Sequence, residues 1–229
     1  MPSWPFACST LRHMTRPYQS SVRRKVVWGR NGVAAADWRN QLPVLCGSRV
    51  ILRELRASDA PSLFAMLTTE EVTRFISPPP PTVECFERFI AWTSGQRGAD
   101  RHICFAVTIA GSDTAIGVFQ MRALEPGFGT AEWGFAIGAP HWGTGAFLDA
   151  AELVLHFAFD VVGVHRLEAR AAVHNDRGNG ALRKLGAVPE GLLRKSFVRN
   201  GEYLDQHLWT ILDEDWAAKK IWERPIVLH

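Results

Sequence analysis

The residues of this chain whose types and spacing suit ligand binding lie in the loop 140–146, which reads Pro-His-Trp-Gly-Thr-Gly-Ala. An apolar run that contains Phe, Trp and Ile, residues 131–138, precedes this loop and is typical of a strand. Apolar residues recur at helical spacing over 144–161, so the loop opens a helix. The first N–H groups of a helix have no partner within it and lie at the positive end of its dipole. The loop therefore predicts a phosphate-binding site.

The loop lacks the Gly-Lys-Ser/Thr sequence of a nucleotide-binding P-loop, which argues against a mononucleotide kinase or an ATPase. The four cysteines stand at positions 8, 46, 85 and 104, with no Cys-x-x-Cys pair and no His-Cys ligand spacing. This pattern supports neither a disulfide framework nor a zinc site, so we expect no metal and a reducing, cytoplasmic location. Cys85 and Cys104 are expected to be buried, inert thiols.

The length and composition predict one domain. With 229 residues, of which 47% are hydrophobic, the chain can bury one sizeable core. No apolar run approaches the roughly 20 residues that span a bilayer, so we expect no membrane association. Residues 1–40 carry seven Lys or Arg against one acid, a net charge of +6, whereas the rest of the chain sums to −3. This mildly acidic body gives no electrostatic support for nucleic-acid binding.

The basic residues 1–40 lack sustained periodicity and are interpreted as a loosely ordered extension. Three interpretations of them stay open. The segment is acid-poor and contains Arg and Ser, as a targeting peptide does, but it lacks the apolar region of a secretory signal. The other two are a basic arm that contacts a polyanion, and an appendage without a role if translation begins further in, for example at Met14.

From residue 49 onward the patterning predicts an α+β domain with a single mixed, mostly antiparallel sheet flanked by helices. Turn signals separate the predicted strands, which are 49–56, 103–109, 115–124, 130–138, 165–173, 191–199 and 203–212. The predicted helices are 58–69 with Ser58 as its cap, 70–75, 82–95, 144–161 and 178–185. Gly186 is expected to end the last helix, and Asn200-Gly201 to form a hairpin turn.

This order of elements, together with several short segments, resembles the GNAT superfamily of acyl-CoA-dependent N-acetyltransferases. The similarity is strongest to its Rim-type branch, which acetylates protein N-terminal amines and includes many small-molecule amine acetyltransferases. The resemblance covers residues 44 to about 216. The matching segments are 50–55 (VILREL), 131–135 (AEWGF), 141–145 (HWGTG), 164–169 (VHRLEA), 175–186 and 199–205 (RNGEYLD).

The resemblance implies a catalytic domain over 44–217, followed by a C-terminal tail, 218–229. It implies acetyl-CoA as co-substrate and a primary amine, either a protein N-terminus or a small molecule, as acceptor. A homodimer is also considered. The alternative is a non-catalytic module of the same fold, which binds acyl-CoA without transferring the acyl group. Replacing Glu132 by Gln discriminates between the two, because an enzyme would lose turnover and keep acetyl-CoA binding.

In this superfamily the loop follows the pattern [Gln/Arg]-x-x-Gly-x-[Gly/Ala], and its backbone amides hold the CoA pyrophosphate. Laid on residues 141–146, the pattern begins with His141 in place of Gln or Arg. Backbone donors need no particular side chain, so we expect the amides to serve here too. Thr144 is expected to add a hydroxyl donor, and Asn175 to contact the pantetheine arm or to form an Asx turn. The residues expected to bind the cofactor are Ile137, His141, Trp142, Gly143, Thr144, Gly145, Ala146 and Asn175.

Glu132 lies where related enzymes place a general base, which often acts through water. Such a base is needed because an α-amine, with a pKa near ~8, must lose a proton before it attacks a thioester. The neighbours Trp133, Phe135 and Ile137 are expected to form an apolar wall that raises the pKa of Glu132. The other interpretation is a solvated carboxylate or the partner of an arginine such as Arg122.

The chain departs from the family at the groups that protonate the thiolate. Leu182 stands where the family often has a tyrosine, and Gly178 where Rim-type members can have a serine. Tyr203, at the final hairpin, is the remaining tyrosine outside the basic extension. Two proton sources are therefore left open: water, and direct passage of a proton from the amine within the tetrahedral intermediate. The acceptor is expected to meet Glu132 and Asp205 as ammonium partners. Its aromatic pocket is expected to contain Phe75, Pro78, Phe119, Trp133 and Trp209.

Overall fold

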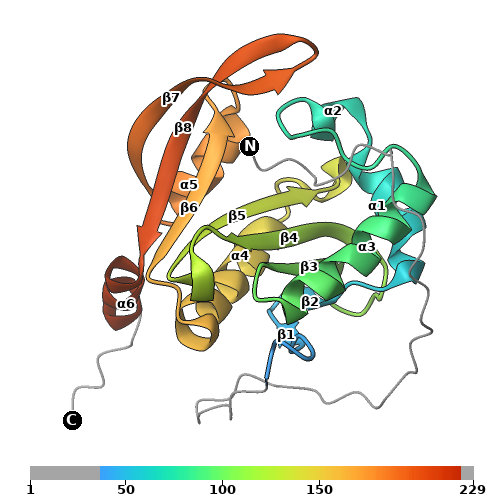
Figure 1. Cartoon of the computed structure of the whole chain (residues 1–229), viewed down its shortest axis with the longest axis horizontal. Helices are drawn as coiled ribbons and strands as arrows, with labels where there is room; N and C mark the ends of the chain where they lie inside the picture. The colour runs from blue at the N-terminus through green and yellow to red at the C-terminus, as the bar shows by residue number, and fades with distance from the viewer. Residues whose placement is uncertain (1–36, 223–229) are drawn as a thin grey trace.

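The computed structural model of the protein describes residues 37–222, which form one eight-stranded sheet with helices on both faces (Figure 1). The strand order is β1-β2-β3-β4-β5-β6-β8-β7. Neighbouring strands are antiparallel except β5 and β6, which are parallel. The strands are β1 (Leu45–Cys46), β2 (Val50–Glu54), β3 (His102–Ile109), β4 (Ala115–Ala123), β5 (Thr130–Ile137), β6 (Arg166–Ala172), β7 (Val188–Arg199) and β8 (Glu202–Leu212).

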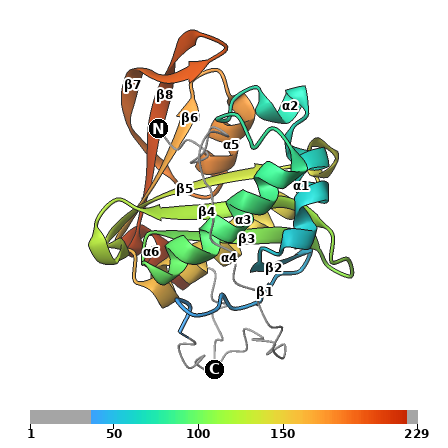
Figure 2. The ribbon, with the colours of Figure 1, turned by 45° about the vertical axis from the view of Figure 1, so that its right-hand side comes forward.

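Two apolar clusters fix the helices to the two faces of the sheet. The helices are α1 (Ala60–Leu67), α2 (Glu70–Thr73), α3 (Val83–Gly98), α4 (Ala146–His156), α5 (Asp176–Lys184) and α6 (Asp213–Trp222). On one face Leu63 of α1 and Phe86 of α3 pack over Val118 of β4 (Figure 2). On the other face Val154 of α4 and Leu182 of α5 belong to the larger cluster. The predicted fold class and order of elements are therefore confirmed, with the short β1 and the C-terminal helix α6 added.

Three predicted helix starts are wrong, and one of them is that of α5, which begins at Asp176 instead of residue 178. The first helix does not begin at Ser58, which lies in a 3-10 turn, Ala57–Asp59; α1 starts at Ala60, with Asp59 as its N-cap residue. The helix predicted over 144–161 starts at Ala146 instead, because Gly145 takes the left-handed conformation that ends the loop. Its last turns, Phe157–Val162, are π-helical and stop at Gly163, with φ of +83°.

The domain is longer at both ends than the sequence suggested. Residues 37–40 were assigned to the basic extension, yet Trp38 is 4% exposed and packs edge-on against Phe128. At the other end α6 continues to Trp222, beyond the expected domain end at residue 217. The interpretations of the rest of the extension, residues 1–36, and of residues 223–229 fall outside the described residues.

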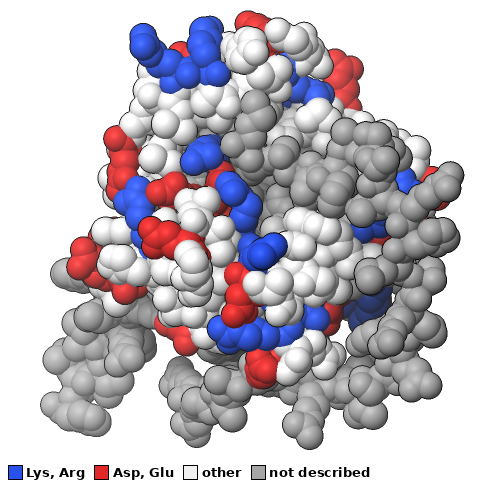
Figure 3. Space-filling model, viewed as in Figure 1, with Lys and Arg blue, Asp and Glu red and all other residues white. Residues whose placement is uncertain are grey.

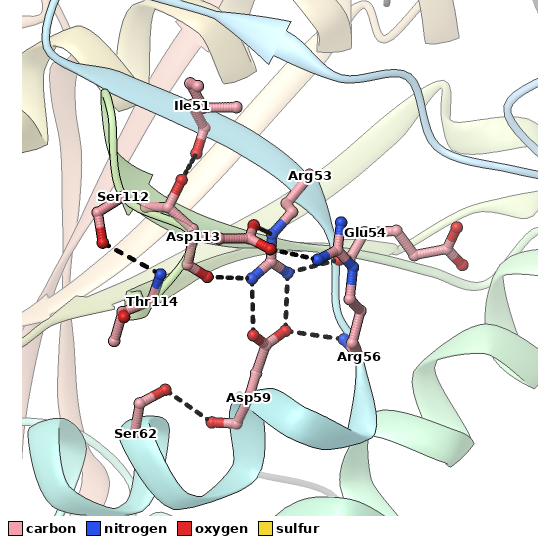
Figure 4. Close-up of polar contacts among 10 residues, drawn as sticks. Ile51, Arg53, Glu54, Arg56, Asp59, Ser62, Ser112, Asp113 and Thr114 are labelled. Carbon is pink, nitrogen blue, oxygen red and sulfur yellow. Dashed lines mark hydrogen bonds and ion pairs between the residues drawn. The ribbon is translucent and has the colours of Figure 1, made fainter. Parts of the chain in front are cut away.

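The buried guanidinium of Arg53 ties three elements together (Figure 4). Its Nη1 and Nη2 donate to both carboxylate oxygens of Asp59 at 2.8 and 2.7 Å, and its Nε donates to Asp113 Oδ1 at 2.7 Å. Burial lowers the pKa of Arg53, but hydrogen bonds to the two carboxylates more than offset this and raise it. The network joins β2, the start of α1 and the β3–β4 turn. It therefore anchors the helices that cover one face of the sheet.

The cysteine prediction is confirmed at both positions: Cys85 is 9% and Cys104 4% exposed. Burial raises the pKa of the Cys104 thiol far above its usual range, so this thiol stays protonated. Across residues 37–222, no helix is both long and apolar enough to cross a bilayer.

Candidate active site

The strands β5 and β6 separate in the middle of the sheet. They pair only from Thr130↔Arg166 to Glu132↔Glu168, although β5 continues to Ile137 and β6 to Ala172 (Figure 1). A cavity of about 100 Å³ lies at this separation. It is lined by Phe75, Ile76, Ser77, Val118, Gln120, Trp133, Gly134, Phe135, Ala136, Ala169, Arg170, Ala171, Asn175, Gly178, Leu182, Phe197 and Gln206. These residues come from both halves of the sheet, from the segment after α2 and from α5.

The loop 140–146 presents backbone donors at the start of α4. Gly143 and Gly145 have φ of +75° and +86°, a left-handed conformation that favours glycine. The N–H groups of Gly143, Thr144 and Gly145 have no acceptor in the described part of the protein. The Thr144 hydroxyl, expected to face the ligand, donates to the His141 carbonyl at 2.8 Å. The loop thus presents the free backbone donors that the predicted anion site requires, and its binding of an anion stays a prediction.

Contacts from three elements hold this loop. Trp142 Nε1 donates to the Ile137 carbonyl at 2.8 Å, and the Arg177 guanidinium lies 4.0 Å from the centre of the Trp142 ring. A Cβ on Gly145 would lie 3.2 Å from Arg49 Nε, so the Arg49 side chain passes directly over the loop. Asp149, in the first turn of α4, fixes the backbone of this arginine by accepting its N–H at 2.7 Å.

Arg49 and Arg177 were not found from the sequence, because no local pattern brings them to the loop. Ile137 and His141, expected at the cofactor, contribute backbone groups to the loop: the Ile137 carbonyl binds Trp142, and the His141 N–H donates to Gly138. The Ile137 side chain itself is 6% exposed and belongs to the core.

Asn175 forms the expected turn, and its contact to the pantetheine arm stays a prediction. Its Oδ1 accepts the N–H of Gly178 at 2.9 Å, which makes it the N-cap of α5 and confirms the turn interpretation. The same residue lines the cavity. A Cβ on Gly178 would lie 2.6 Å from Asn175 Nδ2, so a serine at this position would displace the capping side chain.

Glu132 is buried on the face of the sheet that α1 and α3 cover, which we call the acceptor face. Its Oε2 accepts from Arg122 Nη2 at 2.5 Å, and its Oε1 lies 3.7 Å from Arg170 Nη1. The expected apolar wall of Trp133, Phe135 and Ile137 is wrong, because these residues pack on the α4 face. Adjacent strand residues point to opposite faces, so none of the three flanks Glu132. Its contact with Arg122 matches the alternative interpretation.

Of the five residues expected in the aromatic pocket, two line the cavity, and Pro78 is not one of them. Phe75 and Trp133 line the cavity. Phe119 and Trp209 do not: both are buried in the core, where Phe119 packs beside Phe147 and Trp209 Nε1 donates to Asn179 at 2.9 Å. Both lie on the α4 face, which their strand register sets and which the sequence pattern alone did not fix.

The two residues expected from the final hairpin lie away from the cavity. Tyr203 is 58% exposed, and Asp205 accepts the N–H of Lys195 at 2.8 Å. Neither belongs to the cavity lining. Leu182, which stands where the family often has a tyrosine, does line the cavity and is 1% exposed. No tyrosine in the described residues therefore reaches the cavity.

Polar lining residues that the sequence did not reveal include Gln120 and Arg170. Gln120 Oε1 lies 3.2 Å from Nε2 of the buried His102. Burial lowers the pKa of His102 to about 4. At neutral pH this histidine is uncharged, and its Nε2–H donates to Gln120, which fixes the orientation of that amide. Within residues 37–222, no group of three or more His, Cys, Asp and Glu side chains is placed to hold a metal ion.

The acceptor face is crossed by ion pairs. Besides Arg122 and Glu132, Arg166 Nε lies 2.9 Å from Glu168, and Arg166 Nη2 lies 2.5 Å from Glu190. Hydrogen bonds to Glu190 and Glu168 raise the pKa of Arg166. Basic and acidic side chains accordingly interleave over the described part of this face (Figure 3).

Comparison with known proteins assigns the family. Residues 49–188 match the model of the acetyltransferase (GNAT) domain, so the chain belongs to the GNAT acetyltransferase family. A sequence relative named uncharacterized N-acetyltransferase YoaA, from Bacillus subtilis, is 27% identical over 175 residues, or 74% of this chain and 97% of that protein. The protein is therefore an acyltransferase, as the resemblance implied.

Two solved structures and one further relative are also similar to this chain. A GCN5-related N-acetyltransferase from Brucella melitensis has a TM-score of 0.66 at 26% identity, covering 80% of this chain and 86% of that one. Mycobacterium smegmatis RimJ, in complex with CoA-disulfide, has the same fold, with a TM-score of 0.66 at 19% identity over 75% of this chain and 89% of that one. The ribosomal-protein-serine acetyltransferase of Escherichia coli is 28% identical over 97 residues, or 42% of this chain and 54% of that protein.

Proposed function

We propose that the protein transfers the acetyl group of acetyl-CoA to a primary amine by direct attack. The observation that carries this proposal is the placement of the anion-ready loop and the cavity on the same separation of β5 from β6. The loop directly follows β5, and the cavity lies along the part of β5 that β6 leaves. A long co-substrate with phosphates at one end and a thioester at the other can extend from the loop along β5 to the cavity.

The proposed donor site begins at the loop. The N–H groups of Gly143, Thr144 and Gly145 bind the pyrophosphate, and Arg49 and Arg177 supply positive charge beside it. The pantetheine arm then runs along the edge of β5 toward the cavity, where Asn175 contacts it through the amide group that its capping bond leaves available. The RimJ relative with CoA-disulfide supports CoA as the ligand class.

The proposed chemistry needs one proton acceptor. The neutral amine nitrogen attacks the thioester carbonyl carbon, the C–S bond breaks, and CoA leaves as a thiolate. We assign Glu132 as the base. Because Glu132 is not among the residues that line the cavity, it takes the ammonium proton through a water rather than directly. Its Oε1 is available for this, since it has no hydrogen-bond partner among residues 37–222. Water protonates the thiolate, because Gly178 and Leu182 offer no acidic group.

A second function is favoured by a specific observation. Arg122 binds Glu132, and the cavity lacks a tyrosine in the described chain, as a CoA-binding module without turnover would allow. The test is a panel of amines, namely N-terminal peptides, polyamines, aminoglycosides and free amino acids, assayed for CoA release. Release with any of them supports the enzyme. Tight acetyl-CoA binding without release from the whole panel supports the module.

The proposed reaction is compatible with two classes of acceptor, a protein N-terminus and a small molecule. The Escherichia coli relative named for ribosomal-protein serine favours the first, whereas the small cavity favours a compact amine. A cytoplasmic location and a homodimer stay predictions.

A further inference from the structure

Arg170 is the charged residue of the cavity wall. It lies on β6, opposite Leu208 of β8, and its side chain is 23% exposed. Its Nε is buried and has no hydrogen-bond partner among the residues that the structure describes. A buried donor without an acceptor costs free energy that a bound ligand can recover.

The neighbouring carboxylates do not neutralise Arg170 fully. Glu132 is held at 2.5 Å by Arg122, and its other oxygen is 3.7 Å from Arg170, beyond hydrogen-bond distance. Glu168, two residues away on the same strand and face, is bound by Arg166 at 2.9 Å. The group Arg122–Glu132–Arg170 therefore carries one surplus positive charge. Arg166 is shared between Glu168 and Glu190, so that neighbouring group carries one surplus negative charge, but of these six residues Arg170 is the one that lines the cavity.

The remaining wall around Arg170 is apolar or uncharged. It includes Phe75, Phe197, Gln120 and Gln206. His102, behind Gln120, carries no charge at neutral pH because burial lowers its pKa to about 4. An anion in the cavity would meet no carboxylate of the lining residues.

We propose that the acceptor is an amine with an anionic group, a carboxylate or a phosphate, close to its amino group, and that Arg170 binds this anion. The planar guanidinium fork matches both groups, and such charge-assisted bonds are the strong ones. The inference rests on the proposed amine acetylation and specifies its substrate class. The inference favours a free amino acid or an aminoalkyl phosphate as the acceptor. It disfavours a peptide N-terminus, because the first carbonyl of a peptide belongs to a neutral amide.

The test uses matched acceptors with the full-length protein. CoA release is measured with L-phenylalanine and L-phenylalaninamide for the carboxylate, and with phosphoethanolamine and ethanolamine for the phosphate. We expect the anionic member of at least one pair to have a kcat/KM higher by about 10- to 100-fold, from a charged hydrogen bond worth about 1.5–3 kcal/mol. The pair that shows the difference identifies the anion.

Variants then assign the preference to Arg170. Arg170→Gln should abolish the preference, mainly through a higher KM for the anionic acceptor, and Arg170→Lys should keep part of it. Arg122→Gln removes the arginine that holds Glu132, so Glu132 can pair with Arg170 and the preference should fall in part. Arg194→Gln changes an exposed arginine outside the cavity wall, so this control should retain the preference ratio. Retained stability and acetyl-CoA affinity show that each variant is folded.

Three outcomes overturn the inference. Equal kcat/KM values for the charged and the neutral member of both pairs in the unmodified protein refute the recognition of an anionic group, even if turnover itself supports acetylation. An equal loss for charged and neutral acceptors in Arg170→Gln assigns Arg170 to the reacting centre instead. Absence of CoA release from every amine, with acetyl-CoA still bound, refutes the proposed acetylation and the inference with it.

Discussion

The loop 140–146 and the acceptor face of the sheet offer a ligand different parts of the protein. The loop offers backbone N–H groups, presented by Gly143 and Gly145 in the left-handed conformation. The acceptor face offers side chains, with Glu132 and Arg170 held among ion pairs from neighbouring strands. A backbone site needs only the local chain, whereas a side-chain site needs the correct register of several strands. The first can be found from a short motif, and the second only from the assembled sheet.

If the acceptor face performs the chemistry, Glu132→Gln should lower kcat by about 100- to 10,000-fold, because it removes a general base. The affinity for acetyl-CoA should not change, since the loop is untouched. Steady-state CoA release and acetyl-CoA titration measure the two effects. Glu168→Gln is the matched control, because Glu168 lies on the same face and pairs with Arg166. Equal turnover of Glu132→Gln and the unmodified protein would leave Glu132 as a structural partner of Arg122 alone.

The acceptor face should also depend on the buried network of Arg53. Arg53→Met leaves Asp59 buried without its partner and should lower the free energy of unfolding by about 3–5 kcal/mol. Urea denaturation measures this loss. Arg56→Met is the control, because its side chain is 44% exposed in its pair with Asp113 and should cost less than about 1 kcal/mol. Similar losses from both variants would contradict the role given to the buried pair.

The buried His102 makes the acceptor face sensitive to acid. Its pKa is about 4 in the folded protein, against 6.5 for an ordinary histidine side chain, so the unfolded state binds the proton first as the pH falls. The contribution of this histidine to the free energy of unfolding is therefore fully present above pH 6.5. Between pH 6.5 and pH 4 the free energy of unfolding falls by about 3 kcal/mol. Urea denaturation across this range should show a smaller loss for His102→Gln. Parallel curves for the two proteins would refute this.

The smallest expected effect concerns the loop. Gly145→Ala puts a Cβ at a positive φ, against Arg49, and should weaken acetyl-CoA binding by about tenfold, from strain of about 1–3 kcal/mol. Isothermal titration measures the affinity. Gly180→Ala in α5, where a Cβ meets nothing within 4 Å, should leave it unchanged. If Gly145→Ala instead changes acceptor KM and spares acetyl-CoA binding, the division between loop and acceptor face fails.

The sequence was sufficient for the features that depend on local pattern. Apolar periodicity predicted the order of elements, and the glycine loop was recognised because its function lies in backbone geometry. The apolar wall around Glu132 was predicted wrongly, because residues adjacent in sequence were treated as neighbours in space, whereas a strand sends them to opposite faces.

Arg170 could not be predicted because its position depends on two separate facts. The strand pairing must stop at Glu132↔Glu168 to open the cavity, and Glu132 must be bound by Arg122 to leave Arg170 with surplus charge. Neither fact leaves a local signal in the chain. For the same reason Phe119 and Trp209 looked like pocket residues: aromatic type was visible, but the face of the sheet was not.

The short pairing of β5 with β6 has a mechanical consequence. Only three residue pairs join the two halves of the sheet in the described chain, and beyond them the strands have no backbone bonds to each other. A ligand that lies in this separation contacts both halves, so its binding energy adds to the cohesion of the sheet. Bound co-substrate should therefore slow amide hydrogen exchange on β5 and β6 together. The co-substrate would thus stabilise the fold that binds it, and this stabilisation would end when it dissociates.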